Sequence, residues 1–582
     1  MYSNGKILVG KSADNEGVYL QPGMANRHGL IAGATGTGKT ITLKVLAESF
    51  SDAGVPVFFA DVKGDLAGCC MNGEMNEKIS SRIEKMNISQ EEFTLKKYPV
   101  NFWDVYGEKG MPLRTTISEM GPLLLGKILG LTDVQTDLLT IAFRIADDEG
   151  LLLIDTKDLK SMLNYIGENA KDFSMNYGNI TKASLAVIIR SIVALEAEGA
   201  DKFFGEPALS ISDWLTRDCD GKGTIQILDC QKLVNNPTMY ATFLLWMMSE
   251  LFETLPEVGD MDRPKMVFFF DEAHLLFQNA SKDLIMKVEQ VVKLIRSKGV
   301  GIYFITQTPR DIPDGVLSQL GNKVQHALRA YTPTDQKAVK AAAQSYRENP
   351  AFDTYDTIMD LATGEAIISM LDENGVPGIV QRAMILPPQS CMGGISEDKR
   401  MQEINANLLV TKYQESIDRD SAYEFLQRRN IQLEEEAAAA KEAAEAEKQA
   451  AKEAAEAEKQ KAREEAAAQK QAEREAAAAE RQAAKEAAAA EKAAAKEAAV
   501  AEKQAAKEAA AAEKAAAKKT SERQKAVNTA VKGVASTTAG TIGRQVGKSL
   551  GSSVGGSFGK TLGGNVGASL GRGIIGTLFK LK

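Results

Sequence analysis

Two kinds of hydrophobic pattern alternate along the first 433 residues of the chain. Short apolar runs, such as MVFFF at 266–270, predict buried strands, and longer stretches with apolar residues three or four apart predict helices. From about 107 to 220 the helical pattern dominates, which predicts a mostly helical insertion. Strands that alternate with helices are typical of an α/β fold with a parallel sheet. We therefore predict an α/β domain that carries a helical insertion.

Residues 434–520 follow a third pattern, an eleven-residue repeat. Basic–acidic pairs recur every eleven residues between 441 and 508, in a segment made almost entirely of Ala, Glu, Lys, Gln and Arg. These residues favour helices, and neither Gly nor Pro interrupts them. Eleven residues make three helical turns, so each pair returns to nearly the same face. The repeat predicts either a single solvated helix held by Glu–Lys pairs or a coiled coil packed through alanines.

Residues 521–582 have a period of four, in which an apolar residue followed by Gly recurs from Ile542-Gly543 to Leu570-Gly571. Each Gly costs a helix about 1 kcal/mol relative to Ala, so a lone helix should not persist in water. Small residues four apart do allow close contact between helices. The segment also carries a net charge of +8, which favours an anionic surface. We predict a tail that becomes helical by self-association or on a membrane surface, or else a flexible basic tether.

Charge and cysteine content narrow the class of protein. The chain has a net charge of −8, made up of −13 on the first 433 residues, −3 on residues 434–520 and +8 on the tail. This balance excludes a globally basic nucleic-acid-binding surface but not a local basic patch or ring lining. The five cysteines have no zinc or disulfide spacing, and no signal peptide or apolar run of about 18 residues occurs. We predict a cytoplasmic protein, with peripheral membrane contact through the tail as an alternative.

Residues 33–40, GATGTGKT, match the phosphate-binding pattern G-x-x-x-x-G-K-[ST] in full. The motif follows a short apolar run at 30–32 and precedes a helical pattern, which is the context that makes it specific. Its glycines allow backbone N–H groups to wrap around phosphates at a helix N-terminus. Lys39 would reach the β- and γ-phosphates of ATP, and the Thr40 hydroxyl would bind Mg²⁺. The predicted nucleotide-binding residues are Gly33, Ala34, Thr35, Gly36, Thr37, Gly38, Lys39 and Thr40.

A second acidic motif completes this chemistry. The apolar run at 266–270 ends in Asp271, which would hold Mg²⁺ through water, and Glu272, which would orient and polarise the attacking water. Residues 271–274 also spell the DEAH box of RNA helicases. However, about 230 residues separate the two nucleotide motifs, and the following strand lacks a Ser-Ala-Thr motif. We therefore interpret His274 as an incidental residue at a helix start.

Three further stretches carry a family resemblance: FFADVKGDLAG at 58–68, GTIQILDCQKL at 223–233 and the segment at 296–333. Through them, residues 24–388 resemble the HerA/FtsK superfamily of ring-forming DNA pumps. The first stretch resembles the segment after the second strand of these proteins, and the second stretch resembles their next strand. The stretch from 296 to 333 is similar to their sensor strand and the segment after it, most closely in a HerA-like bacterial subgroup. The resemblance implies a RecA-like P-loop sheet, a homo-oligomeric ring of six copies, ATP with Mg²⁺, and DNA as the polymer that is moved.

The resemblance also implies roles for further side chains. Gln307, at the end of the sensor strand, would contact the γ-phosphate or the attacking water. Superfamily rings use an arginine from the neighbouring subunit to stabilise phosphate charge. The candidates for this arginine are Arg296, Arg310 and Arg329, while Asp61, Lys63 and Asp65 would shape the phosphate end of the sheet.

Two departures from the superfamily leave its DNA function open. About 23 residues precede the predicted sheet where HerA proteins carry a β-barrel, and no winged-helix DNA reader is evident. The alternative to a DNA motor is an ATP-dependent assembly or membrane-associated scaffold that does not act on DNA. The predicted segments are an N-terminal segment at 1–23, the ATPase domain at 24–388, a helical connector at 389–433, the repeat helix at 434–520 and the tail at 521–582.

Overall fold

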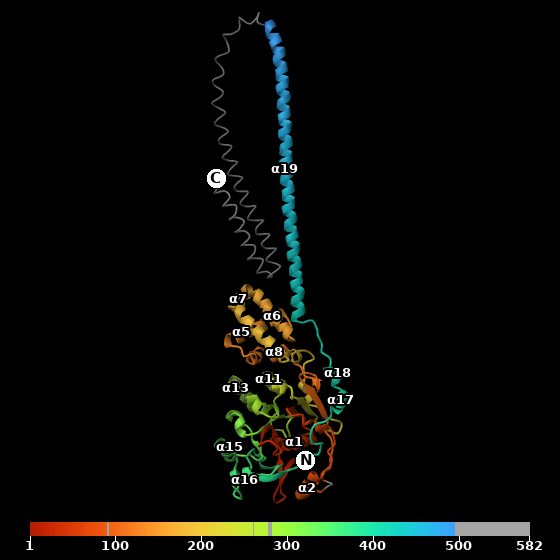
Figure 1. Ribbon diagram of the computed structural model, residues 1–582, viewed down its shortest axis with the longest axis vertical. Helices are drawn as coiled ribbons and strands as arrows, with labels where there is room; N and C mark the ends of the chain where they lie inside the picture. Colours follow the sequence, from red (N-terminus) through yellow and green to blue (C-terminus); the bar gives the residue numbers. More distant parts are fainter. Residues whose placement is uncertain (90–91, 260, 278–281, 495–582) are drawn as a thin grey trace. The chain divides into compact units, whose positions relative to one another are not determined.

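The computed structural model describes residues 1–89, 92–259, 261–277 and 282–494 of the chain (Figure 1). Residues Met1–Lys441 form one compact unit, and a second unit begins at Glu442. The predicted tail at 521–582 lies outside the described residues, as does the end of the repeat segment. No helix in the described part of the chain is long and apolar enough to cross a membrane.

One large mixed sheet organises the first unit. Its central strands are parallel in the order β11-β4-β10-β9-β5-β8-β6-β7. The α/β class predicted from the sequence is therefore confirmed. The bounds of these strands are β4 Gly29–Ala32, β5 Val57–Asp61, β6 Val100–Asp104, β7 Met111–Pro112, β8 Ile225–Asp229, β9 Met266–Phe270, β10 Val300–Thr306 and β11 Asn322–Gln325.

Antiparallel strands extend the sheet beyond β11, and the chain's first residues belong to them. The sequence predicts a separate segment at 1–23, and in the structure these residues contribute three strands to the same sheet. β2 pairs with β13 and with β3, and β13 joins β11 through β12. The bounds are β1 Tyr2–Ser3, β2 Lys6–Ser12, β3 Gly17–Leu20, β12 Glu365–Ser369 and β13 Gln381–Ile385.

The central strands are hydrophobic along their whole length because helices cover both faces of the parallel part. Every residue of β5, β8, β9 and β10 is buried. Phe58 on β5 stacks on Trp214 with ring centroids 4.9 Å apart and lies 5.2 Å from the ring of Phe268 on β9. This packing holds β5 against β9, and the polar residues of the site begin at the carboxyl ends of these strands.

Helices of the first unit lie before, within and after the region at 107–220 (Figure 1). Directly before and after this region are α1 Lys39–Asp52, α2 Glu77–Lys85, α11 Pro237–Thr254, α12 His274–Phe277 and α13 Lys282–Ile295. The region at 107–220 contains α3 Ile117–Met120, α4 Pro122–Ile128, α5 Asp133–Glu149, α6 Thr156–Glu168, α7 Ala170–Tyr177, α8 Lys182–Ala197, α9 Ala200–Phe203 and α10 Ile211–Trp214. Later helices are α14 Asp314–Leu317, α15 Pro333–Gln344, α16 Thr354–Asp360, α17 Glu397–Asn405 and α18 Val410–Tyr413. The short 3₁₀ helices are η1 Pro22–Arg27, η2 Ala67–Cys70, η3 Leu233–Asn235, η4 Arg296–Lys298 and η5 Pro309–Asp311.

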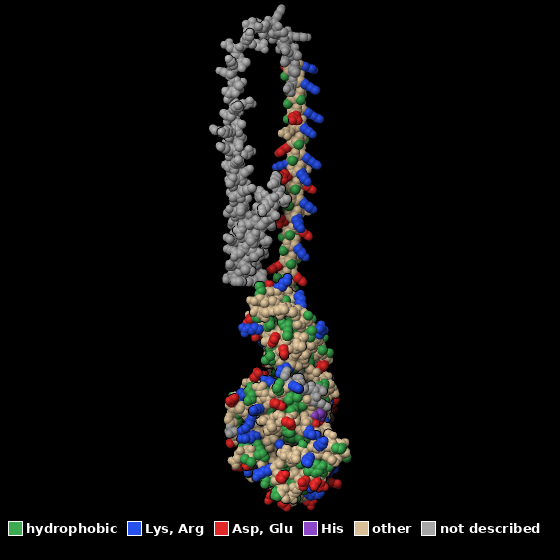
Figure 2. Space-filling view, turned by 90° about the vertical axis from the view of Figure 1, so that its left-hand side faces the viewer, with side chains coloured by type: hydrophobic (Ala, Val, Ile, Leu, Met, Phe, Trp, Pro, Cys, Tyr) green, Lys and Arg blue, Asp and Glu red, His purple; other side chains and the backbone are tan. Residues whose placement is uncertain are grey.

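The long helix predicted from the repeat is present. α19 spans Ala422–Ala494, so it begins before the repeat itself, in the predicted connector. Its described side chains from 434 to 479 are all exposed, and acidic and basic groups line it (Figure 2). Side chains of one helix by itself are exposed in either case, so the solvated single helix and the coiled coil both stay predictions.

Candidate nucleotide-binding site

The phosphate-binding motif forms the turn between β4 and α1, and its neighbours hold it from behind. The N–H of Gly33 donates to the carbonyl of Thr306 at 3.2 Å, and the N–H of Ala34 donates to that of Ala327 at 2.8 Å. The loop is thus attached to the ends of both strands that flank β4. Gly36 and Gly38 have φ angles of 77° and 117°, a region that favours glycine over residues with a Cβ.

Lys39 is almost fully buried and points into this loop. Its Nζ donates to the carbonyls of Gly33 at 2.6 Å and Ala34 at 3.1 Å. Burial lowers the pKa of the Lys39 ammonium, and the negative charges of Glu272 and Asp271 act in the opposite direction. A cation placed inside a ring of backbone N–H groups is the arrangement that binds a phosphate.

A buried histidine packs against the phosphate-binding loop. It is not among the site residues predicted from the sequence. The imidazole of His326 lies 2.8 Å from the Thr42 hydroxyl and 2.9 Å from the Glu365 carbonyl. Burial lowers its pKa to about 4, so the ring is neutral and donates through Nδ1 to the carbonyl. A Cβ at Gly33 would lie 2.5 Å from the Cβ of His326. The first glycine of the motif is therefore needed because His326 packs against it.

Another unpredicted contact fixes the turn beside the loop. The Gly364 N–H donates to the Thr37 carbonyl at 2.9 Å, which connects the phosphate-binding loop to the turn before β12. Arg82 on α2 in turn donates to the carbonyls of Gly364 at 2.9 Å and Thr363 at 3.1 Å. Nothing in the local sequence around Arg82 marks it, because its partners lie about 280 residues away.

The two predicted acidic residues follow β9 directly and are both buried. The N–H of Glu272 donates to Oδ1 of Asp271 at 2.9 Å. Burial raises the pKa of Asp271. Glu272 has a φ angle of 46°, a left-handed conformation that costs a residue with a side chain about 1–2 kcal/mol. Such strain persists where the surrounding structure fixes the residue, as it often does at functional sites.

Three side chains meet the Glu272 carboxylate. Lys63 Nζ lies 2.6 Å from Oε1, and Gln307 Nε2 lies 3.5 Å from Oε2. His274 begins α12, as predicted, and its Nδ1 lies 3.3 Å from Oε2. Burial acts to raise the pKa of the Glu272 carboxyl, but Lys63, together with smaller effects of His274 and Gln307, lowers it below its ordinary value. The structure therefore brings Gln307 and Glu272 together, and it gives His274 a contact that the sequence did not suggest.

The segment at 61–65 lies at the same edge of the sheet. Asp61 is buried and accepts hydrogen bonds from the N–H groups of Gly64 at 2.8 Å and Leu66 at 3.1 Å. Burial raises the pKa of the Asp61 carboxyl to about 6. Asp61 thus holds the loop, Lys63 points to Glu272, and Asp65 is exposed beside Lys63.

The three candidate arginines occupy different places. Arg329 follows β11 and donates to the carbonyls of Met359 at 2.6 Å and Leu361 at 3.2 Å within its own chain. Arg310 lies in η5, directly after β10, and its side chain is exposed. Arg296 is also exposed but precedes β10, at the opposite edge of the sheet from the phosphate-binding loop.

The donor groups at this edge suit a magnesium ion bound together with a nucleotide. Asp271 offers a buried carboxylate at the end of β9, and Thr40 offers a half-buried hydroxyl at the start of α1. Hard oxygen ligands of this kind are the ones that Mg²⁺ prefers, usually with waters and substrate phosphates. Among the described residues no cluster of three or more His, Cys, Asp or Glu side chains could hold a metal ion by itself. Mg²⁺ would therefore need oxygens of the nucleotide as well.

This combination of loop, acidic pair and polar strand end is typical of P-loop nucleotide-binding sites, and comparison with known proteins gives the family. The family model for the helicase HerA-like C-terminal region matches residues 6–488. The chain belongs to this HerA-like family, and the resemblance seen in its sequence is confirmed.

Individual relatives are distant. The DNA double-strand break repair helicase HerA of Sulfurisphaera tokodaii is 22% identical over 387 residues, which cover 63% of this chain and 67% of that protein. A probable helicase of Methanocaldococcus jannaschii is 30% identical over 151 residues, or 25% of this chain, and this match spans 28% of the helicase's own length.

Two solved structures match the chain at low identity and with TM-scores below 0.5. The plasmid coupling protein TrwB in complex with a non-hydrolysable GTP analogue matches with a TM-score of 0.46 and 13% identity, over 68% of this chain and 92% of that chain. VirB4 of Thermoanaerobacter pseudethanolicus matches with a TM-score of 0.41 and 18% identity, over 69% of this chain and all of that chain.

Proposed function

We propose that this protein is a Mg²⁺-dependent ATPase that hydrolyses ATP and couples hydrolysis to the movement of DNA, as a ring of identical subunits. The observation that carries the proposal is the contact between Glu272 and Gln307, 3.5 Å apart, at the carboxyl ends of neighbouring strands. The phosphate-binding loop follows β4, on the other side of β10. A base, an orienting amide and a phosphate cradle therefore lie along one edge of the sheet.

Each group has a distinct part in hydrolysis. Lys39 and the loop N–H groups would bind the phosphates. Asp271 and Thr40 would hold Mg²⁺, which when bound would neutralise charge on the phosphate oxygens. Glu272 accepts a proton from water as the water oxygen attacks the γ-phosphorus, and Gln307 orients that water. The bond from the γ-phosphorus to the oxygen of ADP breaks, which gives ADP and inorganic phosphate.

Two substitutions test these assignments. Lys39→Ala should abolish tight nucleotide binding, because it removes the cation inside the loop. Glu272→Gln should keep nucleotide binding but reduce turnover by about a hundredfold or more, because the amide cannot accept the proton. Equilibrium binding of a fluorescent ATP analogue and steady-state phosphate release measure the two effects.

Matched changes in the helical insertion serve as controls for these two variants. Lys171→Ala and Glu168→Gln alter exposed residues outside the site and should leave both measurements unchanged. Parental turnover in Glu272→Gln protein would contradict the assignment of Glu272 as the base.

The proposed coupling of ATP hydrolysis to DNA can be tested directly. We expect turnover to rise when duplex DNA is added, because motors of this family couple the two. The alternative function is an ATP-dependent assembly scaffold, which the exposed charged side chains of α19 between 434 and 479 favour. A turnover rate independent of DNA across a full titration would reject the DNA motor and favour the scaffold.

A further inference from the structure

The loop after β5 places one lysine beside the proposed base. Asp61 accepts two backbone hydrogen bonds from this loop, and Gln231 donates through Nε2 to the Lys63 carbonyl at 2.9 Å. The backbone of Lys63 is therefore held from two sides. Its side chain, in contrast, is 40% exposed and extends from the loop to Glu272. A fixed backbone with a long, partly exposed side chain allows the ammonium to move while its origin stays in place.

Glu272 has protein partners on both carboxylate oxygens. Lys63 Nζ lies 2.6 Å from Oε1, while Oε2 has Gln307 and His274 within 3.5 Å. The left-handed backbone of Glu272 and its burial leave the carboxylate little freedom to turn away. A carboxylate in a close ion pair has its lone pairs engaged and is a poor proton acceptor for water. The proposed base must therefore lose its lysine partner before it can act.

The strand order indicates which group could replace Glu272 as the partner of the Lys63 ammonium. β4, β10, β9 and β5 are neighbours in that order, with the phosphate-binding loop after β4 and Lys63 after β5. Lys39 thus approaches the site from one side and Lys63 from the other, with Glu272 and Gln307 between them. A terminal phosphate cradled by Lys39 would extend toward the acidic pair and come within reach of Lys63. Its oxygens carry more negative charge than a single carboxylate and would compete for the ammonium.

We propose that Lys63 is a positioning residue that exchanges its partner, leaving Glu272 for the γ-phosphate of bound ATP and thereby releasing the base. This inference rests on the proposed function and adds a residue that distinguishes ATP from ADP. ADP has no γ-phosphate, so with ADP the ion pair between Lys63 and Glu272 persists. The same ammonium therefore restrains the base until a complete substrate is bound.

The test compares binding of two nucleotides by the full-length chain. Lys63→Met removes the ammonium and keeps a side chain of similar length, and Lys63→Arg keeps a charge. In the presence of Mg²⁺, Lys63→Met should weaken binding of a non-hydrolysable ATP analogue by about tenfold while ADP binding changes much less. Lys63→Arg should bind the ATP analogue more tightly than Lys63→Met, because it keeps a positive charge. Steady-state kinetics of Lys63→Met should show a lower kcat as well as a higher KM.

A matched control comes from the other end of the sheet. Lys412 on α18 is 46% exposed and pairs with Asp213 at 2.7 Å, much as Lys63 pairs with Glu272. Lys412→Met should leave the ratio of analogue to ADP affinity unchanged. Circular dichroism melting of all the variants separates a loss of folding from a loss of binding.

The outcomes separate this inference from the proposed function. An unchanged affinity ratio in folded Lys63→Met protein overturns the exchange, even if the parent protein hydrolyses ATP. An equal loss of analogue and ADP binding also overturns it, since that pattern indicates a purely structural role. A selective loss of analogue binding supports the exchange, even if the parent protein proves to have no ATPase activity.

Discussion

His28 is a buried histidine whose two ring nitrogens are both in use. Its Nδ1 accepts a hydrogen bond from the Ile302 N–H at 3.1 Å, and its Nε2 donates to the Val292 carbonyl at 2.8 Å. These contacts require the neutral ring, and burial lowers the pKa of His28 to about 4. The residue stands between η1 and β4, so it joins the start of β4 to β10 and α13.

The lowered pKa of His28 predicts a specific pH dependence of stability. Between pH 6.5 and pH 4 the unfolded chain binds a proton at this residue and the folded chain does not, so stability falls as the pH falls. From pH 7 to pH 5 this residue should remove about 2 kcal/mol from the free energy of unfolding. His28→Gln should have a lower free energy of unfolding than the parent at pH 7. Between pH 7 and pH 5, however, its free energy of unfolding should fall by about 2 kcal/mol less than that of the parent. Urea denaturation of both proteins at the two pH values measures the difference.

Tyr303→Phe is the control for this experiment. Tyr303 is a buried neighbour of β4, and burial raises the pKa of its hydroxyl further above the tested range. Tyr303→Phe can alter the free energy of unfolding, but the decrease in this free energy between pH 7 and pH 5 should equal the decrease in the parent protein. Equal pH dependence in His28→Gln and the parent would show that His28 does not titrate as proposed.

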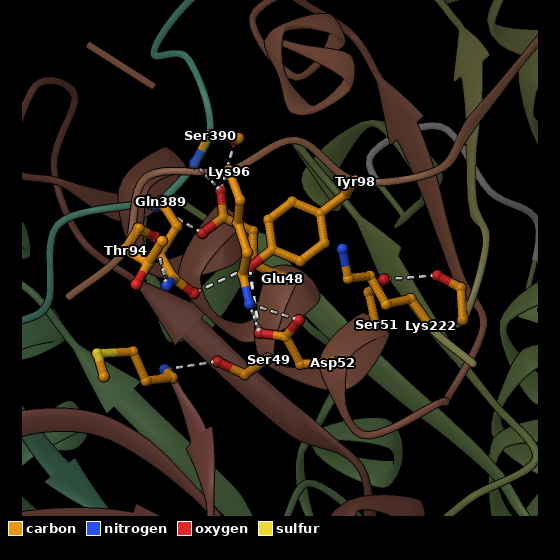
Figure 3. A network of polar contacts seen from close by, with 12 residues as sticks. Glu48, Ser49, Ser51, Asp52, Thr94, Lys96, Tyr98, Lys222, Gln389 and Ser390 are labelled. Atoms are coloured by element: carbon orange, nitrogen blue, oxygen red, sulfur yellow. Dashed lines mark hydrogen bonds and ion pairs between the residues drawn. The ribbon is translucent and has the colours of Figure 1, made fainter. Parts of the chain in front are cut away.

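At the scale of elements, α1 is clamped by the segment that follows β13 (Figure 3). Glu48 of α1 is fully buried and accepts hydrogen bonds from the N–H groups of Gln389 at 2.8 Å and Ser390 at 3.1 Å, and from the Ser390 hydroxyl. Burial raises the pKa of Glu48. Lys44, one turn earlier, donates to the carbonyl of Cys391. The helix that begins at the phosphate-binding loop therefore also holds the start of the predicted connector.

We expect Glu48→Ala to loosen this clamp locally. The change would leave two buried N–H groups without acceptors, each at a cost of about 1–3 kcal/mol. Amide hydrogen exchange at 389–390 should become faster by at least about tenfold. Ser51→Ala provides a control on the same helix, because the Ser51 hydroxyl donates to the Gly223 carbonyl instead. Exchange at 389–390 should stay unchanged in that variant. Parental protection of these amides in Glu48→Ala would show that other contacts hold the segment.

At the scale of the whole molecule, a ring would place each site beside a neighbouring copy. Copies in a ring are related by rotation about the ring axis, so equivalent residues lie at the same height along that axis. A residue at the height of its own nucleotide site is therefore also at the height of the site in the neighbouring copy. Arg310 lies at this edge, is exposed and has no hydrogen-bond or ion-pair partner among the described residues. Arg329 is engaged by carbonyls of its own chain, and Arg296 lies at the other edge. We therefore expect Arg310 to be the arginine that acts across the subunit boundary.

Mixed rings test this expectation. Arg310→Ala protein should bind ATP normally but hydrolyse it slowly, with a loss of about a thousandfold if the arginine stabilises the transferring phosphate. Mixing it with Glu272→Gln protein should restore some turnover, because some interfaces then combine an intact arginine with an intact base. Arg296→Ala should behave like the parent. Energy transfer between fluorescent labels, a different one on each variant, verifies that the rings are mixed, and a lack of recovery in such rings would exclude Arg310.

Elements that are encoded by a short continuous stretch of sequence could be predicted from the sequence. The phosphate-binding loop was predictable because its glycines and lysine act within eight consecutive residues, and the acidic pair because it ends an apolar run. The long helix of the repeat was predictable from helix-forming residues without a breaker, although α19 begins twelve residues earlier than the repeat. Residues 1–23 offered no comparable signal, since short edge strands are defined by the partner they pair with.

The tertiary structure alone decided which distant residues meet at the site. His326 lies under the loop because β11 pairs with β4, and Lys63 reaches Glu272 because β5 pairs with β9. Gln307 could be named from family resemblance, but its contact with Glu272 depends on the register between β10 and β9. Parallel pairing joins residues that are tens to hundreds of positions apart, and no periodicity within one segment encodes its partner. The sequence therefore determined the chemical groups of this protein, while strand order determined which of them act together.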